Sequence, residues 1–509
     1  MRVIVIGDIS GGGNYHLGDE AMSEVAVAEL RKRGAEVVII ADRPQISEPL
    51  YGVRAVRRFE LWRSADRAAK LARMDEILAG VRGTSPLPDE VRETVDAVRS
   101  ADAVVVAGGG NLNSHMTENH LLERVLLKRV SQHLGIPMYV SSQTVGPVVT
   151  GEDRVLLGEL ASYARVFGAR EAATAELMRE ICDGHGTIVQ TLDDVILMDP
   201  SSPPRTIADA PEPGSYVVGS FTMHSGTTGL SREEYYRAIA GILDTIVERC
   251  DVDVLLLPHM GKLGEDNGAS PKTDVFGHNR IAAATRGRVH SLEMMRSEEL
   301  AALTQHARFT ISTRYHPVVF GAGLGVPAIG LVTSFYSAVR MRGALVNVGM
   351  ESLAIPFESW DPLFGAPVLD AVAHQRSQLD AHIQDVRTQQ REYQSRWWDG
   401  IVADISGTGQ VYGTDCVAPT PYEWADPTMQ KMLQLARLAQ EKANREILRS
   451  EIATADAARE LTQWRSELAR VEEQLADLRE ENSALRHRLR PPGAGFRDWI
   501  RGRMKSELR

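Results

Sequence analysis

Short apolar runs rich in β-branched residues alternate with amphipathic, helix-forming stretches over much of this 509-residue chain. In the first part, the apolar runs occupy residues 3–6, 37–40, 103–107 and 138–141. Short strands that are apolar on both faces and separated by helices are typical of parallel βαβ units. The same alternation restarts near residue 215. We therefore expect an α/β chain with two Rossmann-like domains facing a cleft, and ligands beyond the carboxyl ends of the strands.

The C-terminal part has a different composition. Residues 429–490 contain no Gly or Pro and carry a heptad repeat. The a positions are Leu461, Leu468, Leu475, Asn482 and Leu489, and the d positions are Trp464, Val471, Leu478 and Leu485. This pattern predicts an α-helical coiled coil, in which a single Asn at a favours a parallel dimer and hence a homo-oligomer. The alternative is a long helix that docks on the body of the same chain.

The expected domain boundaries follow from these changes in composition. We expect an N-terminal Rossmann-like domain over residues 1–205, a C-terminal one with closing helices over 206–420, the coiled coil over 429–490 and a basic tail over 491–509. Residues 200–204 and 211–214 are rich in Pro, which interrupts helices and strands, so we place the linker there. Residues 54–99 are highly charged and indicate a helical insertion around a Pro-rich loop.

The chain is acidic, with 57 Lys and Arg against 68 Asp and Glu and a net charge of −11. We expect no nucleic-acid partner, because a polyanion binder needs a basic face; an anionic ligand must therefore meet a local basic pocket. The three cysteines form no CxxC pair, and we expect no cofactor and no metal. The spacing of His259, Asp266, Asp274 and His278 is irregular and fits an acceptor-binding or solvated loop better than a metal site.

The ends of the chain bear on its location. The N-terminal sequence runs directly into an apolar strand without the features of a signal peptide, and no apolar stretch is long enough to span a bilayer. Both observations predict a cytoplasmic protein. The basic tail carries Phe496, Trp499 and Ile500, so peripheral contact with a membrane or a partner is one interpretation and a frayed terminus is the other.

Three polar loops follow strands of the first part and should meet at one edge of the sheet. The first contains Asn14, Gly18, Asp19 and Glu20, the second contains Gly109, Gly110 and Asn111, and the third contains Gln143. Glycines let backbone N–H groups approach a ligand, and a helix N-terminus favours anions. Helix capping by Asp19 and Glu20, and a tight turn at the triple Gly, are the structural alternatives.

A further element combines an arginine with a histidine. Residues 311–317 contain Ser312, Arg314 and His316 directly after an apolar run. Arg314 offers a planar fork for a carboxylate or phosphate, and His316 can transfer protons near neutral pH. Arg170 opens another helix and could bring a second guanidinium to the cleft. An ion pair for Arg314, a buried hydrogen-bonded role for His316 and a surface charge for Arg170 are the alternatives.

The order and spacing of these elements resemble the polysaccharide pyruvyl transferase family, over roughly residues 1–350. The resemblance implies a glycosyltransferase-B-like fold. It also implies transfer of the pyruvyl group of phosphoenolpyruvate to a sugar of a cell-surface glycan or its precursor, which gives a pyruvate ketal and phosphate. Arg314 and His316 match the family's Arg-x-His element, and Arg170 matches the Arg of its Arg-Asp/Glu segment.

Two segments depart from the family's pattern. Members usually have Gly-Asn-x-Gly-Asp-Glu, whereas residues 15–17 separate Asn14 from Gly18 here, so this loop is two residues longer. A Tyr-x-x-Lys element often follows the last strand. In this chain Tyr336 is followed by Arg340, and a basic role would have to pass to that arginine.

The residue types suggest how such a reaction would proceed. Arg170 and Arg314 would clamp phosphoenolpyruvate, and His316 would protonate its methylene carbon or the leaving phosphate oxygen. Asp19 or Glu20 would accept a proton from a sugar hydroxyl. Two other functions stay open: a nucleotide-sugar-dependent glycosyltransferase on the same fold, and a non-catalytic coiled-coil scaffold. The motifs determine neither the acceptor sugar, nor whether it is lipid-linked, nor the ketal stereochemistry.

Overall fold

The computed structural model describes residues 1–114, 120–200, 211–488 and 494–506. It contains two parallel sheets that both lie within one compact unit, Met1–Arg449. Residues 201–204 of the predicted linker, the heptad position Leu489 and residues 491–493 of the tail lie outside the described residues.

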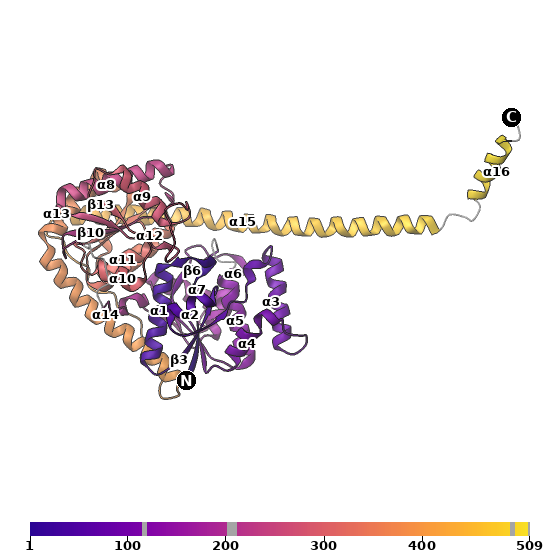
Figure 1. Ribbon diagram of the computed structural model, residues 1–509, viewed down its shortest axis with the longest axis horizontal. Coiled ribbons are helices and arrows are strands. Elements are labelled where there is room, and N and C mark those ends of the chain that lie inside the picture. Colours follow the sequence, from indigo (N-terminus) through magenta and orange to yellow (C-terminus); the bar gives the residue numbers. More distant parts are fainter. Residues whose placement is uncertain (115–119, 201–210, 489–493, 507–509) are drawn as a thin grey trace. The chain divides into compact units, whose positions relative to one another are not determined.

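The first sheet takes all its strands from the N-terminal part of the chain (Figure 1). Its order is β4-β3-β1-β5-β7-β8-β9, with β6 paired to β7. The strands are β1 (Arg2–Ile6), β3 (Glu36–Ala41), β4 (Arg54–Arg57), β5 (Ala103–Val106), β6 (Gly109–Leu112), β7 (Met138–Val145), β8 (Phe167–Ala169) and β9 (Ile188–Gln190). The helices are α1 (Leu17–Lys32), α2 (Pro44–Tyr51), α3 (Arg67–Val81), α4 (Asp89–Arg99), α5 (His120–Leu134), α6 (Gly151–Tyr163) and α7 (Ala172–Cys182), with short turns η1 (Gly11–Gly13), η2 (Leu61–Arg63) and η3 (Asp194–Leu197).

The second sheet has the order β13-β11-β10-β14-β15-β16 and is also parallel. Its strands are β10 (Tyr216–Ser220), β11 (Asp253–Leu256), β13 (Val289–Ser291), β14 (Thr310–Ser312), β15 (Ala328–Val332) and β16 (Ala354–Pro356). The helices are α8 (Arg232–Cys250), α9 (Asp274–Ala284), α10 (Ser297–Thr304), α11 (Tyr315–Leu324), α12 (Phe335–Val346), α13 (Gly365–His374) and α14 (Arg376–Ile405), with turns η4 (Glu351–Leu353), η5 (Phe357–Ser359) and η6 (Trp360–Phe364). A two-stranded antiparallel ribbon joins β2 (Tyr15–His16) to β12 (Met260–Gly261).

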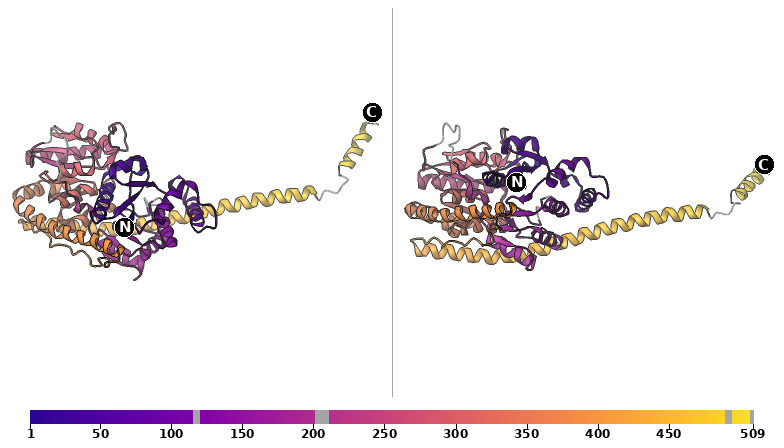
Figure 2. Two further views of the ribbon diagram at one scale, coloured as in Figure 1. Left: turned by 60° about the horizontal axis from the view of Figure 1, so that its bottom comes forward. Right: turned by 90° about the horizontal axis from the view of Figure 1, so that it is seen from below.

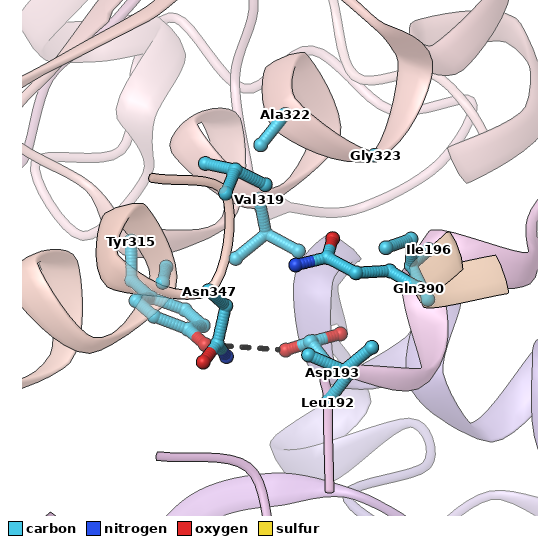
Figure 3. A pocket seen from close by; sticks show the side chains of 11 residues that line it. Leu192, Asp193, Ile196, Tyr315, Val319, Ala322, Gly323, Asn347 and Gln390 are labelled. Carbon is cyan, nitrogen blue, oxygen red and sulfur yellow. Dashed lines mark hydrogen bonds between the residues drawn. The ribbon is translucent and has the colours of Figure 1, made fainter. Parts of the chain in front are cut away.

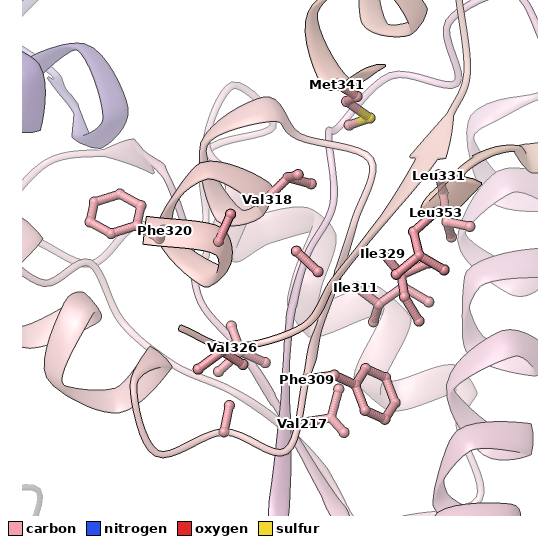
Figure 4. Packing of buried hydrophobic residues seen from close by; sticks show 14 of the residues in the cluster. Val217, Phe309, Ile311, Val318, Phe320, Val326, Ile329, Leu331, Met341 and Leu353 are labelled. Atoms are coloured by element: carbon pink, nitrogen blue, oxygen red, sulfur yellow. The ribbon is translucent and has the colours of Figure 1, made fainter. Parts of the chain in front are cut away.

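The core of the second sheet shows why its apolar runs form buried strands. Val217, Ile311 and Ile329 come from three adjacent strands and are fully buried (Figure 4). Val318 and Phe320 of α11 are fully buried in the same cluster. Burying a side chain of this size contributes about 1.5–3 kcal/mol, so the apolar runs stabilise this sheet. The β14–α11 junction, which carries the Arg-x-His element, therefore starts from a rigid base.

Two elements of the first part differ from the sequence prediction. Arg54–Arg57 lies in the predicted helical insertion but forms the edge strand β4 beside β3; α3 and α4 supply the helices of that insertion. Gly109–Leu112 lies in a predicted loop but forms β6 beside β7. A Cβ atom at Gly108 would lie 1.8 Å from Met22 Cε, so the missing side chain lets this segment run close against α1.

Helix α14 follows the second sheet in sequence, but its C-terminal half packs on the first (Figures 1 and 2). Trp397 and Trp398 are fully buried in one cluster with Val3 and Val5 of β1. The C-terminal half of α14 therefore completes the core of the first sheet, although the sequence predicts that it belongs to the C-terminal domain. Leu379, Ile383 and Val386 of the N-terminal half are buried in the cluster of the second sheet. The division into two domains stays a prediction.

The long Gly- and Pro-free stretch forms one helix, α15 (Pro427–Arg488). Met429 and Leu433 in its first turns are buried in the cluster of the second sheet, so docking on the body of the chain is correct for these turns. The second unit, Ser450–Arg509, contains the rest of α15 and α16 (Ala494–Ser506). Six heptad side chains of this unit are exposed: Leu461, Trp464, Leu468, Val471, Leu475 and Leu478. Their pairing in a coiled coil stays a prediction.

None of the helices in the described ranges is both long and apolar enough to cross a bilayer.

Candidate active site

The first turns of α1 and α11 bring the two sheets into contact. Gly18 lies in the first turn of α1, and His316 lies in the first turn of α11, directly after β14. A Cβ atom at Gly18 would lie 1.8 Å from His316 Nδ1, so the imidazole rests against the backbone of α1. Only glycine leaves room for this contact. The structure thus brings together two predicted site residues that are 298 positions apart in the sequence.

Two guanidinium groups meet beside this contact. Arg170 and Arg340 lie over the ring of Tyr315, with guanidinium carbons 4.3 and 4.6 Å from its centroid. A Cβ atom at Gly110 would lie 2.7 Å from Arg340 Nη2 and 3.1 Å from Arg170 Nη2. Both cations therefore converge on the backbone of β6. The two positive charges that converge here repel one another, and a bound anion between them would relieve this repulsion.

Tyr336 joins the converging arginines to β6. Its hydroxyl donates to the carbonyl oxygen of Gly110 at 2.8 Å and accepts a hydrogen bond from Arg340 Nη1 at 2.8 Å. The Arg340 guanidinium also lies 4.7 Å from the Tyr336 ring centroid. The Tyr-x-x-x-Arg spacing on α12 thus presents its cation where the family's Tyr-x-x-Lys element led us to expect a basic group.

Arg170 is held almost entirely by protein groups. Its Nη1 donates to Asp193 at 2.7 Å, and its Nε donates to Thr144 at 2.6 Å and to Glu171 at 3.1 Å. The side chain is fully buried. Burial opposes the charge, but Tyr315, Glu171 and Asp193 outweigh it and raise the pKa of Arg170. Its Nη2 has no hydrogen-bond partner among the residues described.

A small pocket lies behind this cluster (Figure 3). Asp193 and Tyr315 line it, and the Tyr315 hydroxyl lies 3.4 Å from the Asp193 carboxylate. The remaining lining is largely apolar and includes Val319 and Ile196. Its volume of about 30 Å³ suits a single water molecule rather than a substrate. We therefore interpret this pocket as part of the packing that holds Arg170 in place, and not as a substrate site.

His316 is neutral in the free protein at neutral pH. Burial lowers the pKa of its imidazole well below the ordinary value, and Arg170, Arg340, His259 and Arg314 lower it further. Within the described part of the chain, its Nε2 has no hydrogen-bond partner. A bound anion would reverse the effect of the arginines and favour the imidazolium.

Arg314 is engaged differently from its predicted role as a free clamp. Its Nη2 forms a close ion pair with Asp274, which also accepts the backbone N–H of His259 at 2.8 Å. The Arg314 side chain is 21% exposed, so one face of the guanidinium stays accessible. Its Nε has no partner in the described ranges. The ion pair with Asp274 therefore holds one side of the Arg314 guanidinium, as the ion-pair alternative predicts, and the other side stays accessible.

Three of the four side chains singled out in the predicted acceptor-binding or solvated loop are buried. His259, Asp274 and His278 are buried, and Asp266 is exposed. Burial, together with the Arg314 charge, lowers the pKa of His259 to about 3. Burial likewise lowers the pKa of His278 to about 4, and its Nε2 accepts the backbone N–H of Phe221 at 3.1 Å. Burial keeps both imidazoles neutral. The hydrogen bond from Phe221 to His278 connects the end of β10 with α9.

Asp19 and Glu20 point in different directions. A Cβ atom at Gly109 would lie 3.9 Å from Asp19 Oδ1, an oxygen that is buried and has no partner among the described groups. Burial and the charge of Asp8 raise the pKa of Asp19. Glu20 instead accepts the backbone N–H of Ser10 at 2.7 Å and a short hydrogen bond from the Tyr51 hydroxyl. We therefore keep Asp19 in the site and remove Glu20 from it.

Four other predicted residues have structural contacts or lie at the margin. The Gln143 amide donates to the carbonyl oxygen of Ala107, which ties β7 to β5. Ser312 Oγ donates to the Ser220 carbonyl oxygen at 2.6 Å and accepts the Arg314 N–H at 2.8 Å. The backbone N–H of Asn14 donates to Gly11 and caps η1, and Asn111 lies on β6 next to Gly110. Ser312 therefore shapes the site through backbone contacts, whereas Gln143 Oε1 would lie 3.8 Å from a Cβ atom at Gly109, on the same side as Asp19.

Sequence reasoning missed Tyr315, Asp193 and Glu171 as parts of the site. Tyr315 is the middle residue of the Arg-x-His element and supports both arginines. Glu171 follows Arg170 directly, and its position in the Arg-Asp/Glu segment was the available signal. Asp193 had no such signal, because its contact with Arg170 depends on how η3 packs.

One group of carboxylate and imidazole side chains in the described part of the chain is compact enough to hold a metal ion. It consists of Asp8, His16 and Asp19, with one atom of each lying within 4.8 Å of the others. Asp8 is already bonded to His16 at 2.8 Å and to Arg58 at 3.2 Å. We interpret the group as a hydrogen-bonded network, since its cationic neighbour opposes metal binding.

Comparison with solved structures supports the fold. A Listeria monocytogenes protein assigned as a UDP-N-acetylglucosamine 2-epimerase is 12% identical, with a TM-score of 0.54 over 82% of this chain and 99% of that chain. The S. aureus MnaA-UDP co-structure is 9% identical, with a TM-score of 0.51 over 83% of this chain and 100% of that one. At such identity, these similarities show only the fold, a parallel-sheet α/β arrangement with glycosyltransferase-B-like neighbours.

Comparison at the level of sequence families identifies the chain more closely. A search of curated proteins gave no match. The family model for polysaccharide pyruvyl transferase matches residues 16–334, well over half of the chain, and this range includes Gly18, Arg170 and the Arg-x-His element. The chain therefore belongs to the polysaccharide pyruvyl transferase family.

Proposed function

We propose that this protein transfers the pyruvyl group of phosphoenolpyruvate to a saccharide and forms a pyruvate ketal. The family implies a transferase with a saccharide acceptor. The observation that carries the choice of donor is the convergence of Arg170, Arg340 and His316 on the glycines at 18 and 110. In a chain with a net charge of −11, such a cluster suits a small, highly charged anion.

Each cation has a distinct role in this proposal. Arg170 and Arg340 hold the carboxylate or phosphate of phosphoenolpyruvate, with the free Nη2 of Arg170 as one donor. Arg314 uses its accessible face for the other acidic group of the donor. Because Asp193, Glu171 and Tyr315 fix Arg170 before the substrate arrives, little reorganisation is needed on binding.

The proposed reaction has two steps. A sugar hydroxyl adds to C2 of phosphoenolpyruvate while His316 gives a proton to the methylene carbon, which becomes a methyl group. A second hydroxyl then attacks C2, and the C–O bond to phosphate breaks with its electron pair leaving on phosphate. His316 becomes a competent acid only when the phosphate raises its pKa. Asp19 binds the acceptor hydroxyl through its unpartnered oxygen.

The C-terminal segment adds an assembly proposal. The exposed heptad side chains of α15 favour pairing with a second copy of the chain, which makes the protein a homo-oligomer. The basic residues and Trp499 of α16 would allow peripheral contact with a membrane, where a lipid-linked acceptor would be found. A cytoplasmic location is part of the same proposal.

The decisive experiment measures phosphate release from phosphoenolpyruvate in the presence of candidate glycans. We expect release by the wild type and a loss of about 100-fold or more in His316→Ala. Equal release by both proteins would refute the assignment. Consumption of nucleotide sugars alone would instead support a glycosyltransferase, a function suggested by the UDP-bound fold neighbour. Partner binding without any transferase activity would support a scaffold.

A further inference from the structure

The longer first loop places a histidine beside the proposed donor site. His16 lies in β2, and its backbone pairs with Met260 of β12. The following residue, Leu17, donates its N–H to the His259 carbonyl oxygen at 2.9 Å. The backbone of His16 is therefore held by both halves of the compact unit. This segment contains the two residues by which the loop exceeds the family's pattern.

Asp8 determines which nitrogen of His16 carries the proton. His16 Nδ1 lies 2.8 Å from Asp8 Oδ2, and Arg58 Nη2 donates to Asp8 Oδ1 at 3.2 Å. Burial opposes the charge on Asp8, but His120, His16 and Arg58 hold its pKa well below the ordinary value. Asp8 is thus a carboxylate that can only accept, so Nδ1 must donate. The lone pair of the neutral imidazole is then on Nε2.

The imidazole of His16 lies beside Asp19, a residue of the proposed site. Its Nε2 has no hydrogen-bond partner among the described residues, although the side chain is 28% exposed. Asp19 lies in the same compact group as His16 and also interacts electrostatically with Arg170 and Arg340. Asp19 therefore connects the His16 ring with the two arginines of the donor site. A hydroxyl beside Asp19 would be within reach of both His16 and the donor.

We propose that His16 is the general base that takes the proton from the acceptor hydroxyl, and that Asp8 is its positioning residue. This inference rests on the proposed function. The hydroxyl O–H bond breaks, its proton moves to His16 Nε2, and its oxygen forms the bond to C2. The double-bond electrons of phosphoenolpyruvate take a proton from His316 at C3. The second hydroxyl gives its proton to His316, which is now unprotonated, and this restores the acid. The departing phosphate takes the proton held by His16, so both histidines return to their starting states.

His16 suits this role better than Asp19 does. The charge of Asp19 is shared with two arginines, whereas the lone pair of His16 meets no cation in the described contacts. Burial opposes protonation of His16, but the hydrogen bond to Asp8 and the charges of Asp8, Asp19 and Glu20 raise its pKa above the ordinary value. The other ionisable groups near the pair are Arg58 and His120, and burial lowers the pKa of His120 to about 3. A raised pKa makes the neutral imidazole a stronger base toward a hydroxyl proton.

The test compares His16→Gln and Asp8→Asn with the wild type. Gln keeps a polar side chain beside Asp8 but has no basic nitrogen, and the backbone pairing of β2 does not depend on the side chain. A matched control is His290→Gln, because His290 lies on the surface with its Nε2 3.5 Å from Asp253. The assay is phosphate release from phosphoenolpyruvate with a panel of 4-nitrophenyl hexopyranosides as acceptors, together with calorimetric binding of phosphoenolpyruvate.

We expect His16→Gln to lower kcat about 100- to 10,000-fold while phosphoenolpyruvate affinity changes by less than about threefold. The fall of kcat/KM at acidic pH should disappear in His16→Gln. It should move to lower pH in Asp8→Asn, because loss of the carboxylate lowers the pKa of His16. His290→Gln should match the wild type.

Three outcomes would overturn the inference. Unchanged kcat in His16→Gln would exclude a base at this position. A lower kcat with an unchanged acidic limb would make the role of His16 structural. Loss of wild-type turnover on chelation, restored by a divalent metal ion, would assign the group to metal binding. A wild type that binds no phosphoenolpyruvate would overturn the proposed function itself. Calorimetry on the wild type detects this outcome independently of the comparison between His16→Gln and the wild type.

Discussion

Gly18 offers a test of the site by a single methyl group. In Gly18→Ala the new Cβ would lie 1.8 Å from His316 Nδ1, whereas ordinary contact begins near 3.4 Å. The imidazole must therefore move by about 1.6 Å. Because a displacement of about 1 Å can cost about 100-fold in rate, we expect kcat/KM for phosphate release to fall by at least about 100-fold.

The effect on folding should be much smaller than the effect on rate. Alanine favours a helix over glycine by about 1 kcal/mol, and overpacking costs about 1–3 kcal/mol, so the free energy of unfolding should fall by no more than about 2 kcal/mol. The control is Gly241→Ala in α8, where a Cβ would meet nothing within 4 Å. This control should be at least as stable as the wild type and equally active.

A double-mutant cycle connects the loss to His316. In His316→Ala the ring is absent, so adding Gly18→Ala should reduce the activity no further. Phosphate release and denaturant unfolding are measured for all four proteins. Full activity in Gly18→Ala, or additive losses in the double variant, would refute the reasoning that the imidazole rests on this glycine.

Three other expectations follow from the charges and from the division of the chain. Because the pKa of His316 is low in the free protein and a phosphate raises it, binding of phosphoenolpyruvate should take up a proton and tighten as pH falls. Calorimetry in two buffers of different ionisation enthalpy measures this proton uptake. The uptake should be absent in His316→Ala. Burial raises the pKa of Glu20 to about 8, although donors at Ser10 and Tyr51 oppose this. Its protonated form therefore stabilises the fold at low pH, and this contribution is lost as pH rises through about 8. Glu20→Gln should flatten the decline in unfolding free energy between about pH 4.5 and pH 8, and an unchanged decline would contradict the burial argument. A chain that ends after Arg449 should keep its transferase activity but be monomeric in light scattering; a dimer of the shortened chain would place the interface elsewhere.

Much of the fold could be predicted from local patterns. The runs at residues 103–107 and 328–332 form strands because β-branched side chains that are apolar on both faces can be buried only inside a parallel sheet. The edge strand β4 was missed because two of its four residues are arginines, which are more typical of an exposed helix. The return of α14 to the first sheet was also missed, since nothing local says which core receives Trp397 and Trp398.

The candidate site was predicted in part. Arg170, His316, Gly18 and Asp19 meet as the order of the motifs suggested, whereas Glu20 turns away to Ser10 and Tyr51. Neighbouring carboxylates in a first helical turn necessarily point to different sides, because successive residues are about 100° apart around the axis. Sequence spacing alone does not say which of the two faces the cleft.

The sequence by itself determined the alternation of strands and helices, the family, and the identities of the residues able to bind an anion. These properties depend on side-chain chemistry and on periods of a few residues, which any stretch of sequence displays. The tertiary structure decided how the residues are used: Arg340 joins Arg170 on Tyr315, Asp274 tethers Arg314, and Asp8 orients His16. Contacts such as that between Arg170 and Tyr315 join residues more than 100 positions apart in the chain. Such distances depend on how the two sheets pack, and no local pattern carries that information.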